Sequence, residues 1–426
     1  MNFRRIMAIA VVAAGGFWAV SAQAEETVIW WDFLGGGDGV RMKQMITDFN
    51  AAHTGKIKID ATTLEWGTPF YSKVQTSAAV GEAADVMTYH ASRIPLAVSQ
   101  DILEEITADD MSKMGLSASD FAQTTMGAVT VDGKQYAVPL DTHPIVLYYN
   151  RVLLKKAGVL GDDGRPVGMK NKEEFTATLQ KLKDAGVEFP LGSVTADGNF
   201  MYRTIYSLMC QQGGELLTGN EFLAGDNAEK LAKALAVLQG WTKAGLQSTY
   251  TDYPATVALF TSGKAAMMIN GVWEVPTMTD LAKQGKLFDW GAVEIPVIFD
   301  KRCTYADSHT FAIPKNKGKE ISPEKRAAVL EVISWMDKHS LFWATAGHIP
   351  AYKPVRDSDD FKNLKPNSDY SGLAATAVFD PVSTLAGVAS PVYDAAGNYV
   401  MPAMNGDMDP ADAAQQMRDD LQGQVQ

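Results

Sequence analysis

The stretch over residues 136–158, YAVPLDTHPIVLYYNRVLLKKAG, constrains the fold more than any other part of the sequence, because it passes from an extended to a helical pattern across a polar break. Residues 138–140 and 145–149 are apolar and rich in β-branched and aromatic side chains, which is typical of strands. The polar residues 141–144 between them end in a proline, which cannot donate to a strand ladder. We therefore expect residues 141–144 to lie at a strand end, near solvent.

A short helix is predicted directly after this strand. Asn150 is a suitable helix cap, and apolar residues recur at helical spacing until Gly158 ends the pattern. Strands followed by helices build α/β folds, and ligands of open α/β sheets bind at the strand ends. This predicts an α/β fold in which Asp141 and His143 lie at the mouth of a sheet, where the chain crosses between two lobes.

The first residues indicate export from the cytoplasm. Two arginines precede an apolar run over residues 6–20, and the small residues at 22–24 form a cleavage pattern. Residues 1–24 are therefore predicted to be a signal peptide, with a retained membrane anchor as the alternative. The residue after the cut is Glu25 rather than the cysteine of a bacterial lipoprotein, so we expect a periplasmic protein.

Charge and length limit the possible functions. Removing residues 1–24, which contain two arginines and no other charged residue, changes the formal net charge from −12 to −14. An acidic chain without a cluster of basic and aromatic side chains is a poor ligand for nucleic acid, so no nucleic-acid partner is expected. A chain of 426 residues is longer than one hydrophobic core usually serves and predicts about two domains.

The chain has two cysteines, Cys210 and Cys303, which lie far apart in the sequence. Export would place them in an oxidising compartment, where disulfides form. The two segments are predicted to lie in different parts of the fold, so we expect two buried, unpaired thiols rather than a disulfide. The distance between their Cα atoms decides between the two.

The N-terminal part is predicted to alternate strands and helices. Strands over Thr27–Trp31, Lys56–Leu64 and Ala84–Tyr89 are separated by helical patterns. A glycine-rich loop over residues 35–39 follows the first strand, but Val40 stands where a dinucleotide-binding fingerprint needs its third glycine. The backbone amides of this loop are free to bind a polar ligand, and a flexible turn is the alternative.

The rest of the chain is predicted to continue with helices and strands. A polar loop at residues 196–199 is placed to reach a cleft. Further strands are expected over Ala265–Asn270, Trp290–Phe299 and Ala306–Pro314, and further helices near residues 172–182, 231–245, 254–263, 322–336, 341–346 and 409–421.

Motifs of catalysis and metal binding are missing from the sequence. It contains no G-x-S-x-G, P-loop, H-E-x-x-H or C-x-x-C motif. The six histidines, at positions 53, 90, 143, 309, 339 and 348, show no metal-ligand spacing. No metal site and no cofactor are therefore expected. Several carboxylates at predicted strand ends leave a glycoside hydrolase as an alternative.

Carboxylates and histidines recur beside aromatic residues at the predicted strand ends. The pairs are Trp31-Asp32, Glu65-Trp66, Tyr89-His90 and Trp273-Glu274. Such pairs suit a sugar, because the apolar face of a pyranose stacks on an aromatic ring while its hydroxyls need polar partners. The alternative is that Trp30, Trp66 and Trp273 are ordinary core residues.

Four segments of the sequence are similar to a known family. YAVPLDTHPIVLYYNRVLLKKAGV, LFTSGKAAMMINGVW, AVEIPVIFD followed by SHTFAIPKN, and GHIPAYKPV occur in this order. They resemble the extracellular solute-binding proteins of bacterial ABC importers, in the carbohydrate-binding group that includes maltose-binding protein. The resemblance runs over essentially the whole chain after residue 24.

This resemblance implies a two-lobed α/β fold with a ligand cleft between the lobes. Three crossings are expected, near Leu140–Tyr148, Trp290–Val297 and Gly347–Pro354. The implied N-terminal lobe holds residues 25–140 and 297–347, and the C-terminal lobe holds residues 141–296 and 348–426. Trp273 matches the tryptophan that stacks on sugar in relatives, and His90 and Ser92 stand where the family has a carboxylate.

The residues expected to contact a ligand lie at predicted strand ends or in the glycine-rich loop. They are Asp32, Gly36, Gly37, Asp38, Glu65, Trp66, Tyr89, His90, Ser92, Asp141, Thr142, His143, Trp273, Glu274, Ser308 and His309.

The function implied by the resemblance is that of a periplasmic, non-enzymatic and monomeric component of an ABC importer. It would capture a sugar, either a mono- or oligosaccharide or a derivative, and deliver it to the permease subunits. One alternative is an anionic sugar or a phosphorylated polyol, which would need a cation such as Arg93, Arg203 or Arg356. Another is a secreted glycoside hydrolase.

Overall fold

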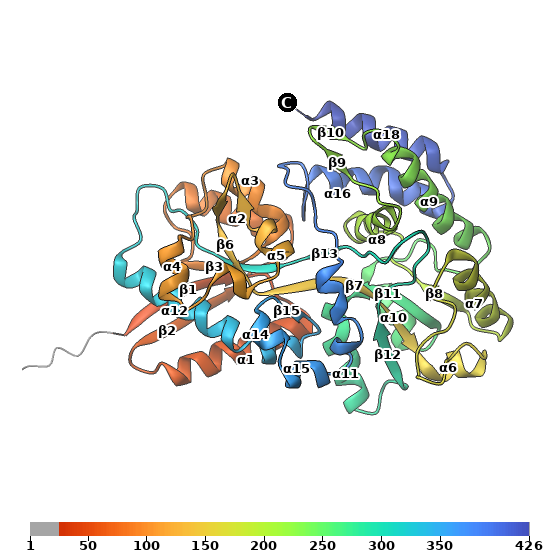
Figure 1. Cartoon of the computed structure of the whole chain (residues 1–426), viewed down its shortest axis with the longest axis horizontal. Helices are drawn as coiled ribbons and strands as arrows, with labels where there is room; N and C mark the ends of the chain where they lie inside the picture. The colour runs from red at the N-terminus through yellow and green to blue at the C-terminus, as the bar shows by residue number, and fades with distance from the viewer. Residues whose placement is uncertain (1–24, 426) are drawn as a thin grey trace, which may run out of the picture.

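Two β-sheets organise the structure, and one long strand, β7, runs from one to the other (Figure 1). The computed structural model describes residues 25–425, so the predicted signal peptide at residues 1–24 lies outside the described residues. We call each sheet with its covering helices a lobe. The two-lobed α/β fold expected from the sequence is confirmed.

The first lobe is built on a five-stranded sheet of order β2-β1-β3-β14-β6. β1, β2 and β3 are parallel, whereas β14 is antiparallel to β3 and β6. The strand order places β2 at the edge of the sheet, and its Ala61 is exposed. The strands are β1 (Glu26–Asp32), β2 (Ile57–Thr63), β3 (Val86–His90), β6 (Ala137–Pro139) and β14 (His309–Ala312), and the main helices are α1 (Gly36–Ala52), α2 (Thr68–Ala79) and α12 (Pro323–Lys338).

The second lobe is built on a sheet of order β12-β7-β11-β8. β11 and β12 are antiparallel to β7, and β8 is parallel to β11. The strands are β7 (Asp141–Asn150), β8 (Phe189–Gly192), β11 (Ala265–Gly271) and β12 (Trp290–Val293). The main helices are α6 (Arg151–Lys156), α7 (Lys172–Asp184), α8 (Gly198–Gln211), α9 (Asn227–Lys243), α10 (Tyr253–Thr261), α11 (Val275–Lys283) and α18 (Pro410–Gly423).

Shorter elements complete both lobes. They are α3 (Ile94–Ser99), α4 (Ala108–Lys113), α5 (Gln123–Ala128), β4 (Thr130–Val131), β5 (Lys134–Gln135), β9 (Leu217–Thr218), β10 (Glu221–Phe222), β13 (Ala306–Asp307), α13 (Ser340–Ala344), β15 (Ile349–Pro350), α14 (Lys353–Arg356), α15 (Asp359–Asn363), α16 (Pro391–Ala395) and α17 (Met401–Asn405). Among residues 25–425, no helix combines the length and apolar character needed to cross a membrane.

Strand β7 is buried over all ten of its residues. The prediction that residues 141–144 lie near solvent was therefore wrong. The physical reason is that two short strands cover this end of β7: β15 pairs with Asp141 and Thr142, and β13 pairs with His143 and Pro144. We call the region where β7, β13 and β15 pair the junction. The predicted cap is confirmed, since Asn150 Oδ1 accepts a hydrogen bond from Leu153 N at 3.1 Å.

The chain passes the junction three times, in β7, in the segment leading to β14, and at β15. Residues 296–303 still lie against α8, because the Gln211 side chain donates to Pro296 O and Cys303 O and accepts from Ile298 N. The second passage therefore comes later than the expected residues Trp290–Val297. The lobe boundaries drawn from the sequence stay a prediction.

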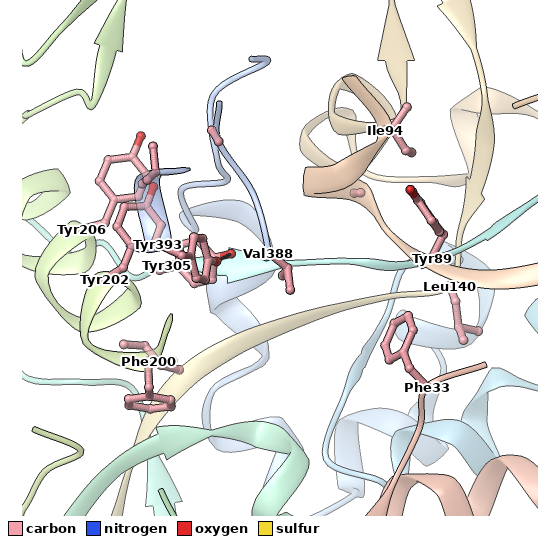
Figure 2. Close-up of a cluster of buried hydrophobic side chains, with 14 of the residues drawn as sticks. Phe33, Tyr89, Ile94, Leu140, Phe200, Tyr202, Tyr206, Tyr305, Val388 and Tyr393 are labelled. Atoms are coloured by element: carbon pink, nitrogen blue, oxygen red, sulfur yellow. Dashed lines mark hydrogen bonds between the residues drawn. The ribbon is translucent and has the colours of Figure 1, made fainter. Parts of the chain in front are cut away.

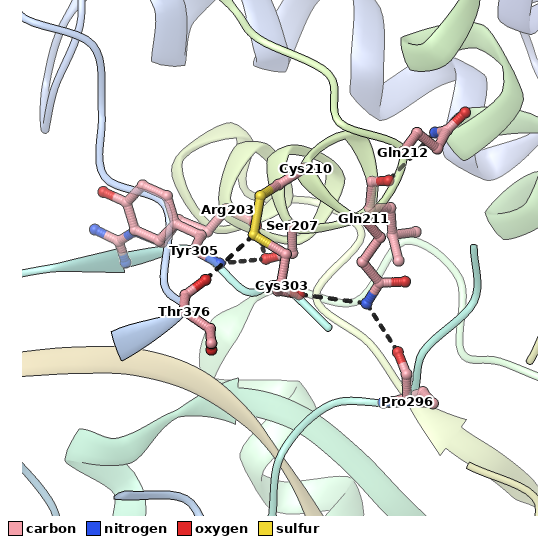
Figure 3. The surroundings of a disulfide bond; sticks show 10 residues. Arg203, Ser207, Cys210, Gln211, Gln212, Pro296, Cys303, Tyr305 and Thr376 are labelled. Atoms are coloured by element: carbon pink, nitrogen blue, oxygen red, sulfur yellow. Dashed lines mark hydrogen bonds between the residues drawn. A yellow bond between two sulfur atoms is a disulfide. The ribbon is translucent and has the colours of Figure 1, made fainter. Parts of the chain in front are cut away.

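Cys210 and Cys303 form a disulfide, with their Cα atoms 5.8 Å apart (Figure 3). The expectation of two unpaired thiols was wrong, because the segment before β13 returns along α8 instead of lying in another part of the fold. A hydrogen bond of 2.7 Å from Tyr305 N to Ser207 Oγ fastens the same two segments one turn away.

Buried aromatic residues gather in both lobes. Tyr202, Tyr206, Tyr305 and Tyr393 gather around α8, and a second group that includes Phe33 lies beside the first sheet (Figure 2). Each lobe therefore carries its own aromatic group, and β7 runs from one group to the other.

Candidate functional site

A cavity of about 600 Å³ lies between the lobes, and both of them line it. The first lobe contributes the loops that follow β1, β2 and β3. The second lobe contributes the start of α8, the start of α10 and the residues after β11. The lining residues are Phe33, Leu34, Gly35, Gly36, Gly37, Asp38, Thr63, Leu64, Glu65, Trp66, His90, His143, Asp197, Asn199, Phe200, Arg203, Tyr253, Trp273, Glu274, Thr277 and His309. Most of them follow the carboxyl ends of strands, where an open α/β sheet binds ligands.

Ten of the residues expected to contact a ligand line this cavity. They are Gly36, Gly37, Asp38, Glu65, Trp66, His90, His143, Trp273, Glu274 and His309. The fold brings these residues together from separate segments of the chain. That they bind a ligand stays a prediction.

Six expected residues, Asp32, Tyr89, Ser92, Asp141, Thr142 and Ser308, are buried outside the cavity lining. Asp32 Oδ1 accepts from Leu34 N at 3.0 Å and so shapes the start of the glycine-rich loop. Ser92 Oγ donates to Asp307 Oδ2 at 2.5 Å, and Ser308 Oγ donates to His309 O at 3.0 Å. These side chains have partners within the protein and support the cavity from behind.

Two tryptophans face the cavity from opposite lobes. Trp66 follows β2 and is 40% exposed, and Trp273 follows β11 and is half-buried. Trp273 Nε1 donates a hydrogen bond to the Tyr253 hydroxyl at 2.7 Å. The Tyr253 hydroxyl in turn donates to Glu274 Oε1 at 2.5 Å. Trp30, by contrast, is fully buried in the core. The core alternative therefore holds for Trp30, while Trp66 and Trp273 keep surface that a ligand can cover.

Arg203 is the cation of the cavity. Its guanidinium carbon lies 5.3 Å from the Trp273 ring centre and 6.0 Å from that of Trp66. The side chain is 7% exposed, forms no ion pair within residues 25–425, and its Nε has no hydrogen-bond partner there. Of the other two candidate cations, Arg93 donates to Ala389 O and Arg356 pairs with Asp357.

Two carboxyl groups in the cavity have a pKa above the ordinary value of a carboxyl group. Burial raises the pKa of Asp38 to about 6, and burial also raises the pKa of Glu274. A carboxyl group with a raised pKa can donate as well as accept a hydrogen bond. The cavity therefore offers both donors and acceptors to a polar ligand.

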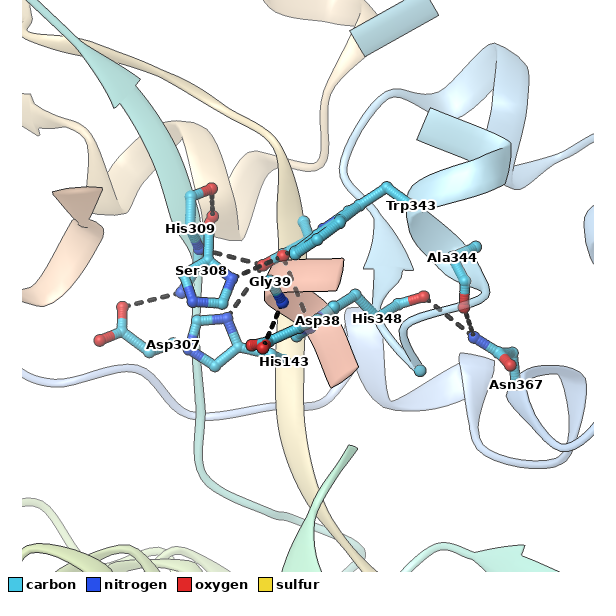
Figure 4. A network of polar contacts seen from close by, with 12 residues as sticks. Asp38, Gly39, His143, Asp307, Ser308, His309, Trp343, Ala344, His348 and Asn367 are labelled. Atoms are coloured by element: carbon cyan, nitrogen blue, oxygen red, sulfur yellow. Dashed lines mark hydrogen bonds and ion pairs between the residues drawn. The ribbon is translucent and has the colours of Figure 1, made fainter. Parts of the chain in front are cut away.

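Four of the six histidines come together at the junction, although no spacing in the sequence indicated it. Three of them, His143, His309 and His348, appear in Figure 4. His143 Nδ1 lies 2.9 Å from Asp141 Oδ1, and His309 Nδ1 lies 2.8 Å from Asp141 Oδ2. His348 Nδ1 lies 3.5 Å from Asp141 Oδ2. His90 stacks on Phe33 with ring centres 4.4 Å apart and bonds to the Tyr71 hydroxyl. His90, His143 and His309 line the cavity, and His348 lies beneath them.

Eleven of the lining residues were not among the expected contacts, although Arg203 was named as a candidate cation for an anionic ligand. Five of them lie at or directly after the ends of β1 and β2: Phe33, Leu34, Gly35, Thr63 and Leu64. The other six lie at or within helices α8, α10 and α11: Asp197, Asn199, Phe200, Arg203, Tyr253 and Thr277. Asp197 and Asn199 belong to the polar loop at residues 196–199 that the sequence placed near a cleft. No local signal marks Tyr253 or Phe200, which enter the site through the packing of α8 and α10.

The rim of the cavity holds two direct contacts between the lobes. Arg41 on α1 forms a bidentate pair with Asp280 on α11, at 3.0 and 2.9 Å. Gly37 packs so closely on Pro276 that a Cβ atom added to it would lie 2.3 Å from Pro276 Cβ. The lobes therefore touch beside the cavity in this arrangement.

Comparison with known proteins gives a consistent result. A sequence model described as bacterial extracellular solute-binding protein matches residues 44–367. The chain is 28% identical to the maltodextrin-binding protein MdxE of Bacillus subtilis over 232 residues, which are 51% of this chain and 49% of that protein. It is 25% identical to a maltooligosaccharide ABC transporter solute-binding lipoprotein of Streptococcus pneumoniae over 347 residues, which are 78% of this chain and 74% of that one. The match to the first relative thus spans about half of its length.

Solved structures agree on the fold. The GacH receptor of Streptomyces glaucescens superposes with a TM-score of 0.78 at 18% identity, over 95% of this chain and all of that one. A maltose-bound T. maritima MalE3 gives a TM-score of 0.77 at 20% identity, over 93% of this chain and 98% of that one.

Proposed function

Because the chain belongs to the bacterial extracellular solute-binding protein family, we propose that it captures a carbohydrate and delivers it to an ABC importer. The ligand is a mono- or oligosaccharide or a derivative of one, the compartment is the periplasm, and the protein acts as a monomer without turnover. The single observation that carries the proposal is the pair Trp66 and Trp273, which face one cavity from opposite lobes among carboxylates and imidazoles. Relatives whose names include maltodextrin and maltooligosaccharide point in the same direction.

The chemistry of the cavity suits a sugar. An apolar pyranose face can stack on an indole ring, and such contacts are worth more than the buried area alone. The hydroxyls need hydrogen-bond partners, since a polar group buried without one costs about 1–3 kcal/mol. Asp38, Glu274, His143 and Arg203 supply acceptors and donors around the rings.

Binding would be coupled to closure of the lobes. A ligand that touches both lobes binds the closed arrangement more tightly than an open one and therefore shifts the population toward it. The Arg41–Asp280 pair and the Gly37–Pro276 contact would form only on closure. The permease would then recognise a surface that exists only in the closed protein.

A second candidate ligand is an anionic sugar or a phosphorylated polyol. The observation that favours it is Arg203, a buried guanidinium in the cavity without an ion pair in the described chain. A bidentate contact to a carboxylate or phosphate is the interaction that arginine makes best. Four carboxyl groups in the same lining, Asp38, Glu65, Asp197 and Glu274, oppose it. The neutral sugar is therefore the primary proposal.

A melting-temperature screen tests these alternatives. Neutral mono- and oligosaccharides, uronic acids and sugar phosphates are added separately, and a ligand at about 100 times its dissociation constant stabilises the protein by roughly 2.7 kcal/mol. We expect a neutral sugar to raise the melting temperature, and mass spectrometry to recover it intact. A shift caused only by anionic compounds and lost in Arg203→Met would favour the second candidate. Cleaved sugar would identify a hydrolase, and a response to none of these compounds would contradict the proposal.

A further inference from the structure

One carboxylate and three imidazoles form a buried cluster at the junction. Asp141 and His143 come from β7, His309 from β14, and His348 immediately precedes β15. One ligand atom from each residue lies within 4.8 Å of the others, and none of the four residues is more than 5% exposed. The cluster therefore draws on all three passages of the chain between the lobes.

The distances within the cluster match those between ligands of one metal ion. The three Nδ1 atoms lie 2.9, 2.8 and 3.5 Å from an oxygen of Asp141. Two ligands bound tetrahedrally to Zn²⁺ at about 2.0–2.1 Å are separated by about 3.3 Å. All four ligand atoms lie within 4.8 Å of one another, so no pair exceeds the tetrahedral separation by more than about 1.5 Å.

Hydrogen bonding within the protein explains only part of the cluster. His143 and His309 each have Asp141 as a partner. His348 has none: it is completely buried, and neither of its ring nitrogens has a hydrogen-bond partner in the described chain. Buried polar atoms without a partner are rare in proteins and call for an unseen ion or water. The unpartnered Nδ1 of His348 lies on the side of the ring that faces Asp141.

We propose that Asp141, His143, His309 and His348 bind a divalent transition-metal ion, for which three imidazoles and one carboxylate make Zn²⁺ the best suited. Four protein ligands leave no open position, which is the pattern of a structural rather than a catalytic zinc site. Trp343 fits the role of a supporting residue, since its Nε1 donates to Asp141 Oδ2 at 2.8 Å and its ring stacks on His348 at 4.6 Å (Figure 4). Supporting contacts of this kind orient metal ligands.

The ion would fasten the junction whether or not sugar is bound. Its ligands span three separate segments, so binding is linked to folding of the crossing region. The site adjoins the cavity, because His143 and His309 also line it. It does not include Trp66 or Trp273, and its existence can be tested without any sugar.

The test uses tag-free protein that has been dialysed against a chelator and then given ZnCl₂ or CoCl₂ alone. We expect one bound ion per chain by elemental analysis, a higher melting temperature with Zn²⁺, and the intense visible absorption of four-coordinate Co²⁺. Wild-type protein that takes up no stoichiometric ion overturns the proposal, whatever the variants do.

Two variants locate the ion. His348→Ala, and His348→Gln if the alanine variant does not fold, should lose the bound ion and the cobalt spectrum. His339→Ala is the matched control, because His339 is exposed at the end of α12 and its ring contacts Trp335 rather than the cluster. Ion uptake that survives in both His348 variants, or is lost in His339→Ala, overturns the assignment to this cluster.

Discussion

Replacing Gly37 by alanine would place a methyl group against the opposite lobe. Gly37 lies in the first turn of α1, and the added Cβ would stand 2.3 Å from Pro276 Cβ at the start of α11. The backbone of Gly37 does not have a positive φ, so alanine is compatible with its conformation. Alanine also favours a helix over glycine by about 1 kcal/mol. We therefore expect Gly37→Ala to weaken ligand binding while leaving the unliganded protein equally stable or slightly more stable.

The contact distance gives the size of the effect. Carbon atoms pack at about 3.5–4.0 Å, so the lobes must separate by more than 1 Å at this point or the chain must deform. Forcing an extra methyl group into a packed contact costs about 1–3 kcal/mol. At about 1.4 kcal/mol per factor of ten, the dissociation constant should rise roughly 5- to 150-fold.

Calorimetric titration with the sugar found in the melting screen measures this change, and melting of the unliganded variant measures stability. Gly39→Ala is the comparison, because its added Cβ would lie 2.2 Å from the Leu34 carbonyl oxygen within the same lobe. That variant should melt at a lower temperature without ligand. Small-angle scattering should show that ligand compacts Gly37→Ala less than the wild type.

Two results would refute this reasoning. Unchanged affinity would mean that ligand binding does not bring Gly37 on α1 closer to Pro276. A fall in the unliganded melting temperature as large as that of Gly39→Ala would mean that the contact is permanent, so that the lobes do not open here. A direct collision of the new methyl group with the sugar is tested by adding Pro276→Gly, which should restore affinity only if the two lobes collide.

Three further predictions concern binding, pH and redox state. Trp273→Ala should weaken sugar binding by about 2–4 kcal/mol in calorimetry, as loss of an aromatic binding residue does; unchanged affinity with a strongly lowered unliganded melting temperature would identify it as a packing residue. Burial alone would raise the pKa of Asp110, but hydrogen bonds from Arg326 and Thr107 lower it to about 2, below its unfolded value of about 3.9. The ionised carboxylate therefore stabilises the folded protein above pH 4, and this stabilisation is lost between about pH 4 and pH 2. In Asp110→Asn, the free energy of unfolding should fall by about 1–2 kcal/mol less than in the wild type between pH 4 and pH 2, after allowance for solvent screening. The same loss of stability in both proteins, measured by urea unfolding, would contradict this. Reducing the Cys210–Cys303 disulfide should destabilise the protein by about 2–4 kcal/mol in denaturant unfolding, and identical oxidised and reduced curves would contradict that.

Local patterns predicted much of the fold. The strand, glycine-rich loop and helix over residues 27–49 could be predicted because the spacing of apolar residues and the position of the glycines indicate the same elements over a short range. The same holds for the strand at Ala265–Asn270, which carries Trp273 to the cavity. The resemblance to a known family then supplied the two-lobed arrangement.

Long-range packing decided what the sequence could not show. Residues 141–144 read as polar and exposed, but strands from about 160 and 200 positions later cover them. The disulfide and the histidine cluster have the same origin, since each joins segments that only the folded chain brings together. Asp141 illustrates the difference: it was expected to contact ligand, and it instead lies beneath the cavity and bonds to His143, His309 and Trp343.

The volume of the cavity has a consequence for hydration. A space of about 600 Å³ is large enough to hold many water molecules. A monosaccharide would displace some of this water and retain the rest as bridges to the cavity walls, whereas an oligosaccharide would expel most of it. Solutes that are excluded from protein surfaces, such as sucrose analogues that do not bind, favour states with less hydration. The slope of affinity against osmotic pressure should therefore report how many water molecules are released, and through that number the length of the sugar chain.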